Sequence, residues 1–210
     1  MIAKTLITAR GGSKGIPRKN IIDIKGKPLI QYTIKASIRS NVSETWVSTD
    51  DLEIANISKG CGAKVIIRPN ELCDDIIMPD AALTHFAQNE DFDVLVFIQP
   101  TSPLLESKYI NIGLAMMKDN DSVFTAYKQH WYPQWRSNAE PLGWNIQKRP
   151  RRQDVEEVFV ENGALYITTR EQLLKSGLRY GGKIGIIEMP LHESFQLDSK
   201  DDLKLLEKLL

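Results

Sequence analysis

Short runs of β-branched and other apolar residues alternate along this chain with amphipathic segments. The apolar runs predict strands at residues 2–8, 45–48, 64–67, 94–98, 122–126, 164–167 and 184–189. The amphipathic segments predict helices at 29–40, 52–59, 80–88, 107–118 and 201–209. Apolar runs bounded by polar turns are typical of strands buried on both faces. Because strands that alternate with helices need crossover connections, the pattern predicts an α/β fold with a mostly parallel, Rossmann-like sheet and helices on both faces.

Charge and length narrow the possible partners and the domain organisation. The chain has 210 residues, with 27 Lys and Arg against 27 Asp and Glu. We expect a single domain over residues 1–210, since a chain of this size buries roughly 70% of its unfolded surface without a metal or disulfide. A net charge of zero gives no general attraction to nucleic acid or to anionic lipid. An anionic ligand would therefore need a local cluster of cations.

Cysteine usage and the hydropathy of the chain bear on its compartment. Cys61 and Cys73 form no CxxC pattern, which argues against zinc. A disulfide between them stays open, but two reduced thiols are favoured. Residues 1–10 show no signal peptide, and no stretch approaches the roughly 20 apolar residues of a membrane helix. We expect a soluble, cytoplasmic protein with no nucleic-acid or membrane partner.

The regular alternation breaks after residue 126. Residues 128–154 carry Trp131, Trp135 and Trp144 together with the basic run 148–152. A long aromatic-rich excursion in an α/β chain is typical of a segment that covers a site or binds another subunit. We interpret residues 128–157 as a dimerisation insertion, which makes the protein a homodimer. The alternative is a solvated loop whose tryptophans pack on the core.

A glycine-rich basic loop, ARGGSKGIPRKN, covers residues 9–20 directly after the first predicted strand. Its glycines let backbone N–H groups turn toward an anion, and Arg10, Lys14, Arg18 and Lys19 supply the local positive charge. The loop matches neither the Walker pattern nor the dinucleotide fingerprint. In parallel sheets, ligands lie at the carboxyl ends of the strands. We therefore predict that this loop wraps a phosphate chain.

At this loop the chain resembles the CMP-sialic acid synthetases, the acylneuraminate cytidylyltransferases. The resemblance continues in order along the chain, with GKPLIQYTI, VSTD, RPNEL, QPTSPL, RRQD, ENGALY and GGK. It implies the fold of the nucleotide-diphospho-sugar transferases. It also implies transfer of CMP from CTP to the anomeric hydroxyl of a nonulosonic acid such as sialic acid, with pyrophosphate as the second product.

The resemblance implies roles for individual residues around the nucleotide. Arg10 would contact phosphate oxygens that are not transferred, and Lys19 would lie near the α-phosphate. Arg68 would help to frame the cytosine. The nucleotide-binding set implied in this way is Arg10, Gly11, Gly12, Ser13, Lys19, Asn20 and Arg68.

The acid sugar is assigned to a second implied set, which consists of Gln99, Ser102, Arg152, Asn162 and Tyr166. Arg152 matches a basic residue that reaches the partner subunit's site in the family, and a guanidinium suits the sugar carboxylate because it recognises carboxylates with a two-pronged fork. Strand packing is the alternative for Tyr166. Leu105 stands where the family usually has Arg, which leaves the function of that Arg unassigned here.

The implied cofactor is Mg²⁺, which would neutralise the triphosphate. The family typically has an Asp-x-Asp before its last helix, where this chain has Gln196 and Asp198. We expect both in the metal site, on one face of a strand, with catalysis assigned to Arg10, Lys19 and Asp198. The Gln adds no negative charge, so retained activity with weaker Mg²⁺ affinity is expected. Helix capping is the alternative for Asp198.

Two other functions remain open from the sequence. One is a cytidylyltransferase for a different acid sugar, such as ketodeoxyoctonate. The other is a catalytically weakened CTP-binding protein, which Leu105 and Gln196 keep open. Neither His85, His130 nor His192 is placed to form a nucleophile–base pair, so catalysis is expected to come mainly from positioning and charge.

Overall fold

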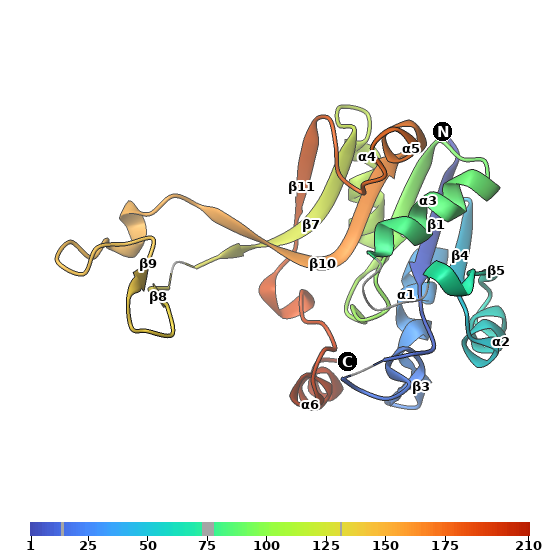
Figure 1. Cartoon of the computed structure of the whole chain (residues 1–210), viewed down its shortest axis with the longest axis horizontal. Helices are drawn as coiled ribbons and strands as arrows, with labels where there is room; N and C mark the ends of the chain where they lie inside the picture. Colours follow the sequence, from blue (N-terminus) through green and yellow to red (C-terminus); the bar gives the residue numbers. More distant parts are fainter. Residues whose placement is uncertain (14, 73–77, 131) are drawn as a thin grey trace.

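A seven-stranded sheet forms the centre of the molecule in the computed structural model, which describes residues 1–13, 15–72, 78–130 and 132–210 (Figure 1). Its order is β11-β7-β10-β6-β1-β4-β5. These strands are β1 (Ala3–Thr8), β4 (Glu44–Thr49), β5 (Lys64–Ile67), β6 (Val94–Ile98), β7 (Ser122–Gln129), β10 (Val158–Thr169) and β11 (Ile184–Glu188). All of the predicted strands are present, and the predicted α/β fold with a mostly parallel sheet is confirmed.

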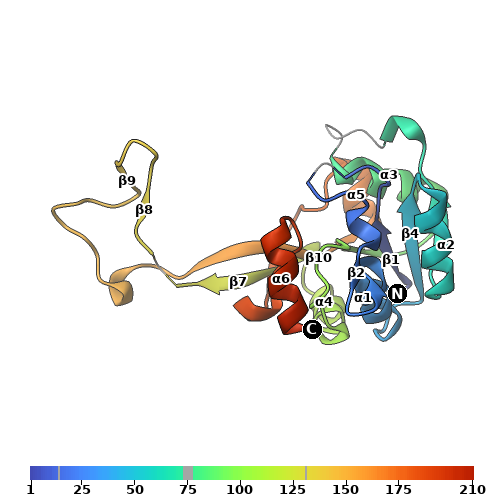
Figure 2. The ribbon, with the colours of Figure 1, turned by 90° about the horizontal axis from the view of Figure 1, so that it is seen from below.

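Helices cover both faces of this sheet, as predicted. One face packs against α1 (Leu29–Ile38), α2 (Leu52–Gly60) and α4 (Ser107–Met116), and the other against α3 (Pro79–Asn89) and α5 (Arg170–Ser176) (Figure 2). The last helix, α6 (Lys200–Leu209), packs with α1 in a smaller cluster. Short elements complete the fold: β2 (Asp23–Ile24), β3 (Lys27–Pro28), η1 (Lys19–Ile21), η2 (Asn70–Leu72) and η4 (Leu191–Glu193).

Local sequence explains where several helices begin. The Asp51 carboxylate accepts a hydrogen bond from the Ile54 N–H at 2.9 Å and so caps α2. Ser199 and Asp202 form a reciprocal capping box at the start of α6. The alternative assignment of Asp198 as the cap of this helix is therefore not supported, because the Ser199 hydroxyl accepts from the Asp202 N–H.

The parallel strands place three loops at one edge of the sheet. In the register of β1 with β4, Thr8 lies opposite Ser48, and in the register of β1 with β6, Ile7 lies opposite Ile98. The strands consequently end at nearly the same level, and the segments that follow them leave from one edge.

β10 is the exception to the parallel arrangement, because it is antiparallel to both β6 and β7. Its pairing with β7 is interrupted between Glu161 and Tyr166. Such a bulge re-aims side chains locally. β10 is also longer than the predicted strand at 164–167, and α5 follows it where no helix was predicted.

The arm, residues 132–157, extends away from the sheet beyond the ends of β7 and β10 (Figures 1 and 2). It contains the small antiparallel pair β8 (Gln134–Trp135) and β9 (Pro141–Leu142), and the turn η3 (Arg152–Asp154). The rings of Trp135 and Trp144 pack edge to face at 4.9 Å, and Trp135 is 50% exposed. The alternative in which the tryptophans pack on the core is thus wrong for Trp135. Trp131 lies outside the described residues.

Two further expectations concern the cysteines and membranes. Cys61 is buried and forms no disulfide among the residues that the structure describes, and burial raises the pKa of its thiol. Cys73 lies outside the described residues.

In the described ranges, every helix is too short or too polar to cross a membrane.

Close packing of α4 on the sheet depends on Gly113. A Cβ at this position would lie 2.5 Å from Ile167 Cδ1 and 2.8 Å from Ile187 Cδ1. We predict that Gly113→Ala destabilises the protein by about 1–3 kcal/mol through overpacking. Gly60→Ala is the matched control, because nothing lies within 4 Å of the added methyl group. It is expected to be neutral or to stabilise by up to about 1 kcal/mol. Urea unfolding of both variants measures the difference, and equal stabilities would contradict the packing account.

Candidate functional site

A cleft of about 390 Å³ lies at the carboxyl ends of β1, β4 and β6. It collects residues from five parts of the chain: the end of β1 with the loop after it, the segment after β5, the start of α3, the end of β6 with the segment after it, and the turn before α6. Among the predicted site residues, it is lined by Arg10, Ser13, Lys19, Asn20, Arg68, Gln99 and Asp198. The sequence patterns for a nucleotide site therefore converge on one cavity.

The loop after β1 is held by its own backbone and by polar side chains. The Ala9 N–H donates to the Ser48 carbonyl at 2.9 Å, and the Gly11 N–H donates to Asp50 Oδ1 at 2.9 Å. Asn20 is buried, and its Nδ2 donates to the Arg10 carbonyl at 3.0 Å. Asn20 thus closes the loop as well as lining the cleft. Gly11 and Gly12 lie in this loop without lining the cavity.

The cations of the loop separate into two groups. Arg18 turns away from the cleft to a bidentate pair with Asp51, at 2.5 and 3.1 Å, and to Glu53. The Arg18 hydrogen bond lowers the pKa of the Asp51 carboxyl. The expectation that Arg18 adds charge for an anionic ligand is therefore wrong. Lys14 lies outside the described residues.

Lys19 and Asp198 meet across the cleft. The Lys19 ammonium lies 3.0 Å from Asp198 Oδ1, and the Asp198 side chain is 67% exposed. A lysine in this position presents a point charge to a phosphate, and the carboxylate holds it there before any ligand enters. The cleft therefore combines a cation for phosphate with a carboxylate that remains accessible to solvent.

Arg68 forms the buried side of the cleft. Its side chain is 6% exposed, with Nε 3.1 Å from Ser48 Oγ and Nη2 2.9 Å from the Ser48 carbonyl. These bonds fix the guanidinium at the end of β4. A buried, oriented guanidinium suits the polar edge of a base or a phosphate oxygen.

The segment after β6 supplies hydroxyl groups. Gln99 lines the cleft, and its carbonyl accepts from the Ser102 N–H at 3.3 Å in a turn. Thr101 Oγ1 and Ser102 Oγ are buried without a hydrogen-bond partner among the described residues. Buried hydroxyls of this kind are uncommon in folded proteins. Thr101 is one of the residues that line the cleft, although its hydroxyl oxygen is itself buried, and Ser102 is not among the lining residues.

Asn162 and Tyr166 lie outside the cleft lining. Asn162 is buried and bonded to Thr125 Oγ1 at 2.7 Å and to Ser194 Oγ at 2.9 Å. Tyr166 is 2% exposed, stacks on Phe97 at 5.5 Å, and donates to Glu161. Burial raises the pKa of Tyr166, with Glu161 adding to the effect. Tyr166 thus contacts the cleft lining through Phe97, whereas these partners of Asn162 lie outside the lining.

Arg152 belongs to the arm and is remote from the cleft of its own chain (Figure 1). Its Nη2 lies 2.5 Å from His130 Nδ1. Within one copy, the structure does not bring Arg152 to the other predicted sugar-binding residues.

The expected metal pair does not lie on a strand. Residues 194–198 form no strand, so the geometry derived from strand alternation is wrong. Leu197 is fully buried between the two residues. The Gln196 side chain donates to the Asn162 carbonyl, whereas Asp198 faces Lys19. In the described part of the chain, no group of three His, Cys, Asp or Glu side chains is arranged to hold a metal ion. One carboxylate is consistent with an ion bound mainly by substrate phosphates.

Several cleft residues carry no polar signal in the sequence. Leu72, Met78, Pro79, Ala82 and Phe97 are among the lining residues. They are apolar, so only the position of Phe97 near the end of β6 could have indicated it in advance. Leu105 is 3% exposed in the main core, which explains how an apolar residue is accommodated where the family usually has Arg.

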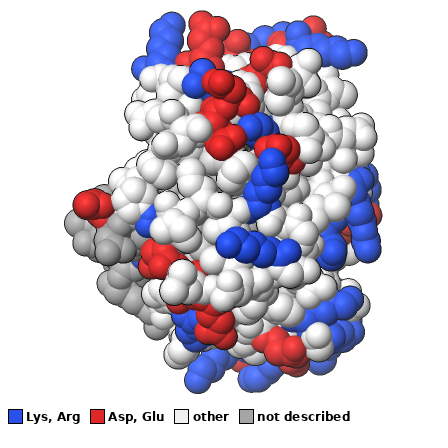
Figure 3. All heavy atoms as spheres, turned by 90° about the vertical axis from the view of Figure 1, so that its right-hand side faces the viewer, with Lys and Arg blue, Asp and Glu red and all other residues white. Residues whose placement is uncertain are grey.

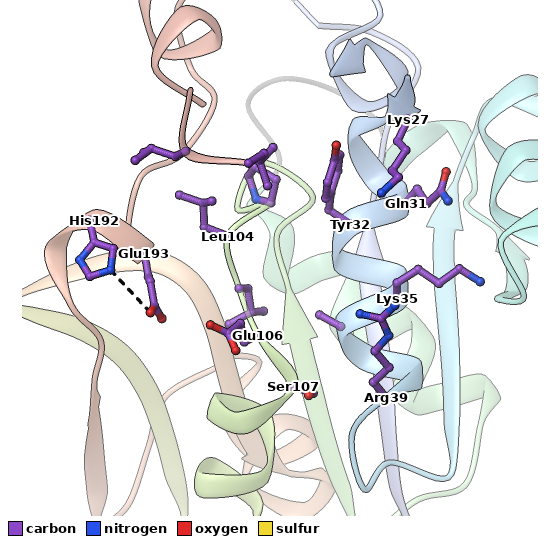
Figure 4. Close-up of a pocket in the computed structure, with 15 residues that line it drawn as sticks. Lys27, Gln31, Tyr32, Lys35, Arg39, Leu104, Glu106, Ser107, His192 and Glu193 are labelled. Carbon is purple, nitrogen blue, oxygen red and sulfur yellow. Dashed lines mark ion pairs between the residues drawn. The ribbon is translucent and has the colours of Figure 1, made fainter. Parts of the chain in front are cut away.

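A second, larger cavity of about 580 Å³ lies between α1, residues 103–107 and η4 (Figure 4). Lys27, Lys35 and Arg39 contribute cations, and Glu106 and Glu193 contribute acids. None of the predicted substrate-binding residues is among its described lining residues. Volume alone would favour this cavity, but the convergence of motifs identifies the smaller cleft as the candidate site.

Opposite charges are interspersed on the face that carries α2 and β5 (Figure 3). This face has no broad region of one sign. The mixture of charges on this face agrees with the zero net charge of the chain, and the cations Arg10, Lys19 and Arg68 are concentrated at the cleft.

Comparison with known proteins identifies the family. Residues 5–209 match the cytidylyltransferase family. The chain is 38% identical over 214 residues to N-acylneuraminate cytidylyltransferase A of Danio rerio, covering 97% of this chain and 49% of that protein. It is 30% identical to the pseudaminic acid cytidylyltransferase of Campylobacter jejuni, covering 95% of this chain and 92% of that protein. The chain spans about half the length of the N-acylneuraminate cytidylyltransferases that it matches.

The fold has a solved counterpart. CMP:2-keto-3-deoxy-manno-octonic acid synthetase, solved in complex with CTP, superposes with a TM-score of 0.75 at 18% identity, covering 100% of this chain and 98% of that one. This likeness concerns the fold alone. The sequence matches by themselves show that the chain belongs to the cytidylyltransferase family.

Arg68 provides a test of the cleft as a nucleotide site. We predict that Arg68→Met weakens CTP binding by about 10- to 100-fold, because a charge-assisted hydrogen bond contributes roughly 1.5–3 kcal/mol. Arg170→Met is the matched control, since Arg170 Nη2 also donates to a backbone carbonyl, that of Ala87, at 2.9 Å, but next to the amino end of β6. Titration calorimetry on the folded variants compares them. Equal CTP affinities would exclude Arg68 from the site.

Proposed function

We propose that this protein transfers CMP from CTP to the anomeric hydroxyl of a sialic-acid-like nonulosonic acid. The observation that carries the proposal is the convergence of Arg10, Lys19, Arg68 and Gln99 on one cleft at the carboxyl ends of the parallel strands. The names of the relatives support it, because they include enzymes for N-acylneuraminate and for pseudaminic acid.

The proposed reaction forms one bond and breaks one. The anomeric oxygen attacks the α-phosphorus of CTP, the bond from that phosphorus to the bridging oxygen of the β-phosphate breaks, and pyrophosphate leaves. The hydroxyl proton passes to solvent. In this arrangement Arg10 binds oxygens of the leaving phosphates, Lys19 stabilises charge that develops at the α-phosphate, and Gln99 orients the sugar.

Mg²⁺ is the proposed cofactor, and it would neutralise negative charge on the triphosphate. Asp198 is the residue that would hold it, because its carboxylate is exposed in the cleft. Gln196 would act through a water bound to its carbonyl oxygen, while its amide nitrogen donates to the Asn162 carbonyl. The ion would therefore depend on the phosphates for most of its oxygen ligands.

The arm is proposed to form a dimer interface that completes the site. Its half-exposed Trp135 and exposed Tyr132 offer apolar surface, and Arg152 lies at its end nearest to β10. In a dimer, Arg152 would reach the sugar carboxylate bound by the partner copy, which explains its distance from the cleft of its own chain. Residues 1–210 are proposed to act as a single cytidylyltransferase domain in the cytoplasm.

The acid sugar is the point at which the candidate activities differ. Pyrophosphate release from CTP should be measured with sialic, legionaminic, pseudaminic and ketodeoxyoctonic acids in parallel. Pyrophosphate release with a nine-carbon acid supports the proposal. Release only with ketodeoxyoctonate would show that the acceptor is this eight-carbon acid and not a nonulosonic acid. CTP binding without turnover on any acid would instead favour a weakened CTP-binding protein, a reading that Leu105 and Gln196 keep open.

Lys19 and Arg18 are adjacent cations with different predicted effects. We expect Lys19→Met to lower kcat by about 10²- to 10³-fold, as for the loss of a pre-organised transition-state donor. Arg18→Met should lower kcat by less than about tenfold, because Arg18 is bonded to Asp51 rather than directed into the cleft. Steady-state kinetics with saturating CTP measure both. Similar losses in the two variants would contradict the division of the loop cations.

Metal dependence separates the roles of Asp198 and Gln196. We predict that Asp198→Asn raises the Mg²⁺ concentration needed for half-maximal turnover, because the cleft loses its carboxylate at this position. Gln196→Asp should lower that concentration if position 196 contributes to the metal site through water. Activity measured across a Mg²⁺ titration tests both variants. An unchanged Mg²⁺ dependence in Gln196→Asp would remove Gln196 from the site.

A further inference from the structure

We propose that the buried ion pair between Asp80 and Arg179 is a positioning element for the nucleotide cleft. The pair joins the first turn of α3, which forms one wall of the cleft, to the loop between α5 and β11. The proposal rests on the proposed function only in taking CTP as the ligand. Neither residue lines the cleft, so both act through their neighbours.

The pair is bidentate and almost fully buried. Arg179 Nη2 lies 2.5 Å from Asp80 Oδ2, and Arg179 Nε lies 3.1 Å from Oδ1. The backbone N–H of Arg179 adds a third bond to Asp80 Oδ1 at 2.8 Å. Both residues are 6% exposed. Burial alone would raise the pKa of the Asp80 carboxyl, but the Arg179 hydrogen bonds outweigh it and hold that pKa below its ordinary value.

Residues of the cleft wall flank Asp80 on both sides in the sequence. Met78, Pro79 and Ala82 line the cavity, while the Asp80 side chain points into the protein toward Arg179. Because Asp80 belongs to the same helical turn, its position fixes the position of the wall. Arg68 and residues of the basic loop line the same cavity as this wall.

Arg179 also contacts the aromatic layer beneath the cleft. Its guanidinium lies 5.2 Å from the Phe97 ring centre and 4.9 Å from that of Tyr166, and these two rings stack at 5.5 Å. Phe97 is itself part of the cleft lining. Arg179 thus connects the floor, at Phe97, to the wall, at Asp80, and sets the width of the cavity between them.

Stability alone does not account for such a pair. A buried ion pair pays for its desolvation, and apolar residues of similar volume often stabilise a protein equally well. A bidentate guanidinium–carboxylate pair differs from apolar packing in that it fixes the relative orientation of its two partners. The pair is therefore suited to holding two elements, 99 residues apart in the sequence, in one geometry.

The double variant Asp80→Leu/Arg179→Met separates positioning from stability, because it removes the pair without leaving a lone buried charge. We expect it to fold with a Tm somewhat below that of the parent, because the Arg179 backbone N–H loses its acceptor, and to bind CTP about tenfold more weakly. We also expect a raised KM for CTP and a kcat within about twofold. Arg179→Lys, which keeps the charge but loses the fork, should show a smaller change in the same direction. Unchanged CTP affinity in the folded double variant would overturn the proposal.

Lys4→Met is the matched control. Lys4 is 12% exposed and pairs with Glu90 at 2.6 Å and Glu44 at 3.4 Å, at the amino end of β1 and so opposite to the cleft. It should lose stability without losing CTP affinity, and an equal loss of affinity would also overturn the proposal. The positioning role of the ion pair is tested by calorimetric CTP binding, and the proposed function is tested by turnover of an acid sugar. If the parent turns over no acid sugar, the proposed function is contradicted, but the CTP affinities of the variants can still be compared.

Discussion

β1 is hydrogen-bonded in parallel on both sides, to β4 through residues 4–8 and to β6 through residues 3–7. Parallel neighbours run in one direction, so the loops after all three strands leave the sheet at the same edge. That constraint brings the basic loop, Arg68 after β5 and Gln99 after β6 around one cavity. The cleft depends on this register, because a shift of one residue would move every side chain of a strand to the opposite face of the sheet.

The distribution of charge follows from the same arrangement. A neutral chain can bind a polyanion only where cations outnumber acids locally, and the cleft holds Arg10, Lys19 and Arg68 against Asp198. The two acids at the β4–α2 junction do not line the cleft: Asp51 pairs with Arg18, and Asp50 accepts from the Gly11 N–H. Local pairing therefore divides the cations of one loop into those that fix its shape and those that face a ligand.

The sequence predicts the sheet, the helices on both faces and the basic loop well, because each depends on local periodicity or on residue types that are confined to one place. It does not predict the antiparallel β10 or the direction of the arm, since these depend on long-range pairing across the bulge at Glu161. The Arg18–Asp51 and Asp80–Arg179 pairs join residues 33 and 99 positions apart, and no periodic pattern indicates either. The apolar wall of the cleft is likewise indistinguishable from core in the sequence.

Hydrogen exchange with and without CTP tests most directly whether the cleft at the strand ends is the nucleotide site. Peptides covering residues 8–13, 15–20 and 97–102 should exchange more slowly when CTP is bound, because these segments contain residues that line the cavity. Residues 27–39 and 191–193, which border the larger cavity, should be unchanged. Protection confined to the larger cavity, or no protection at saturating CTP, would contradict the account.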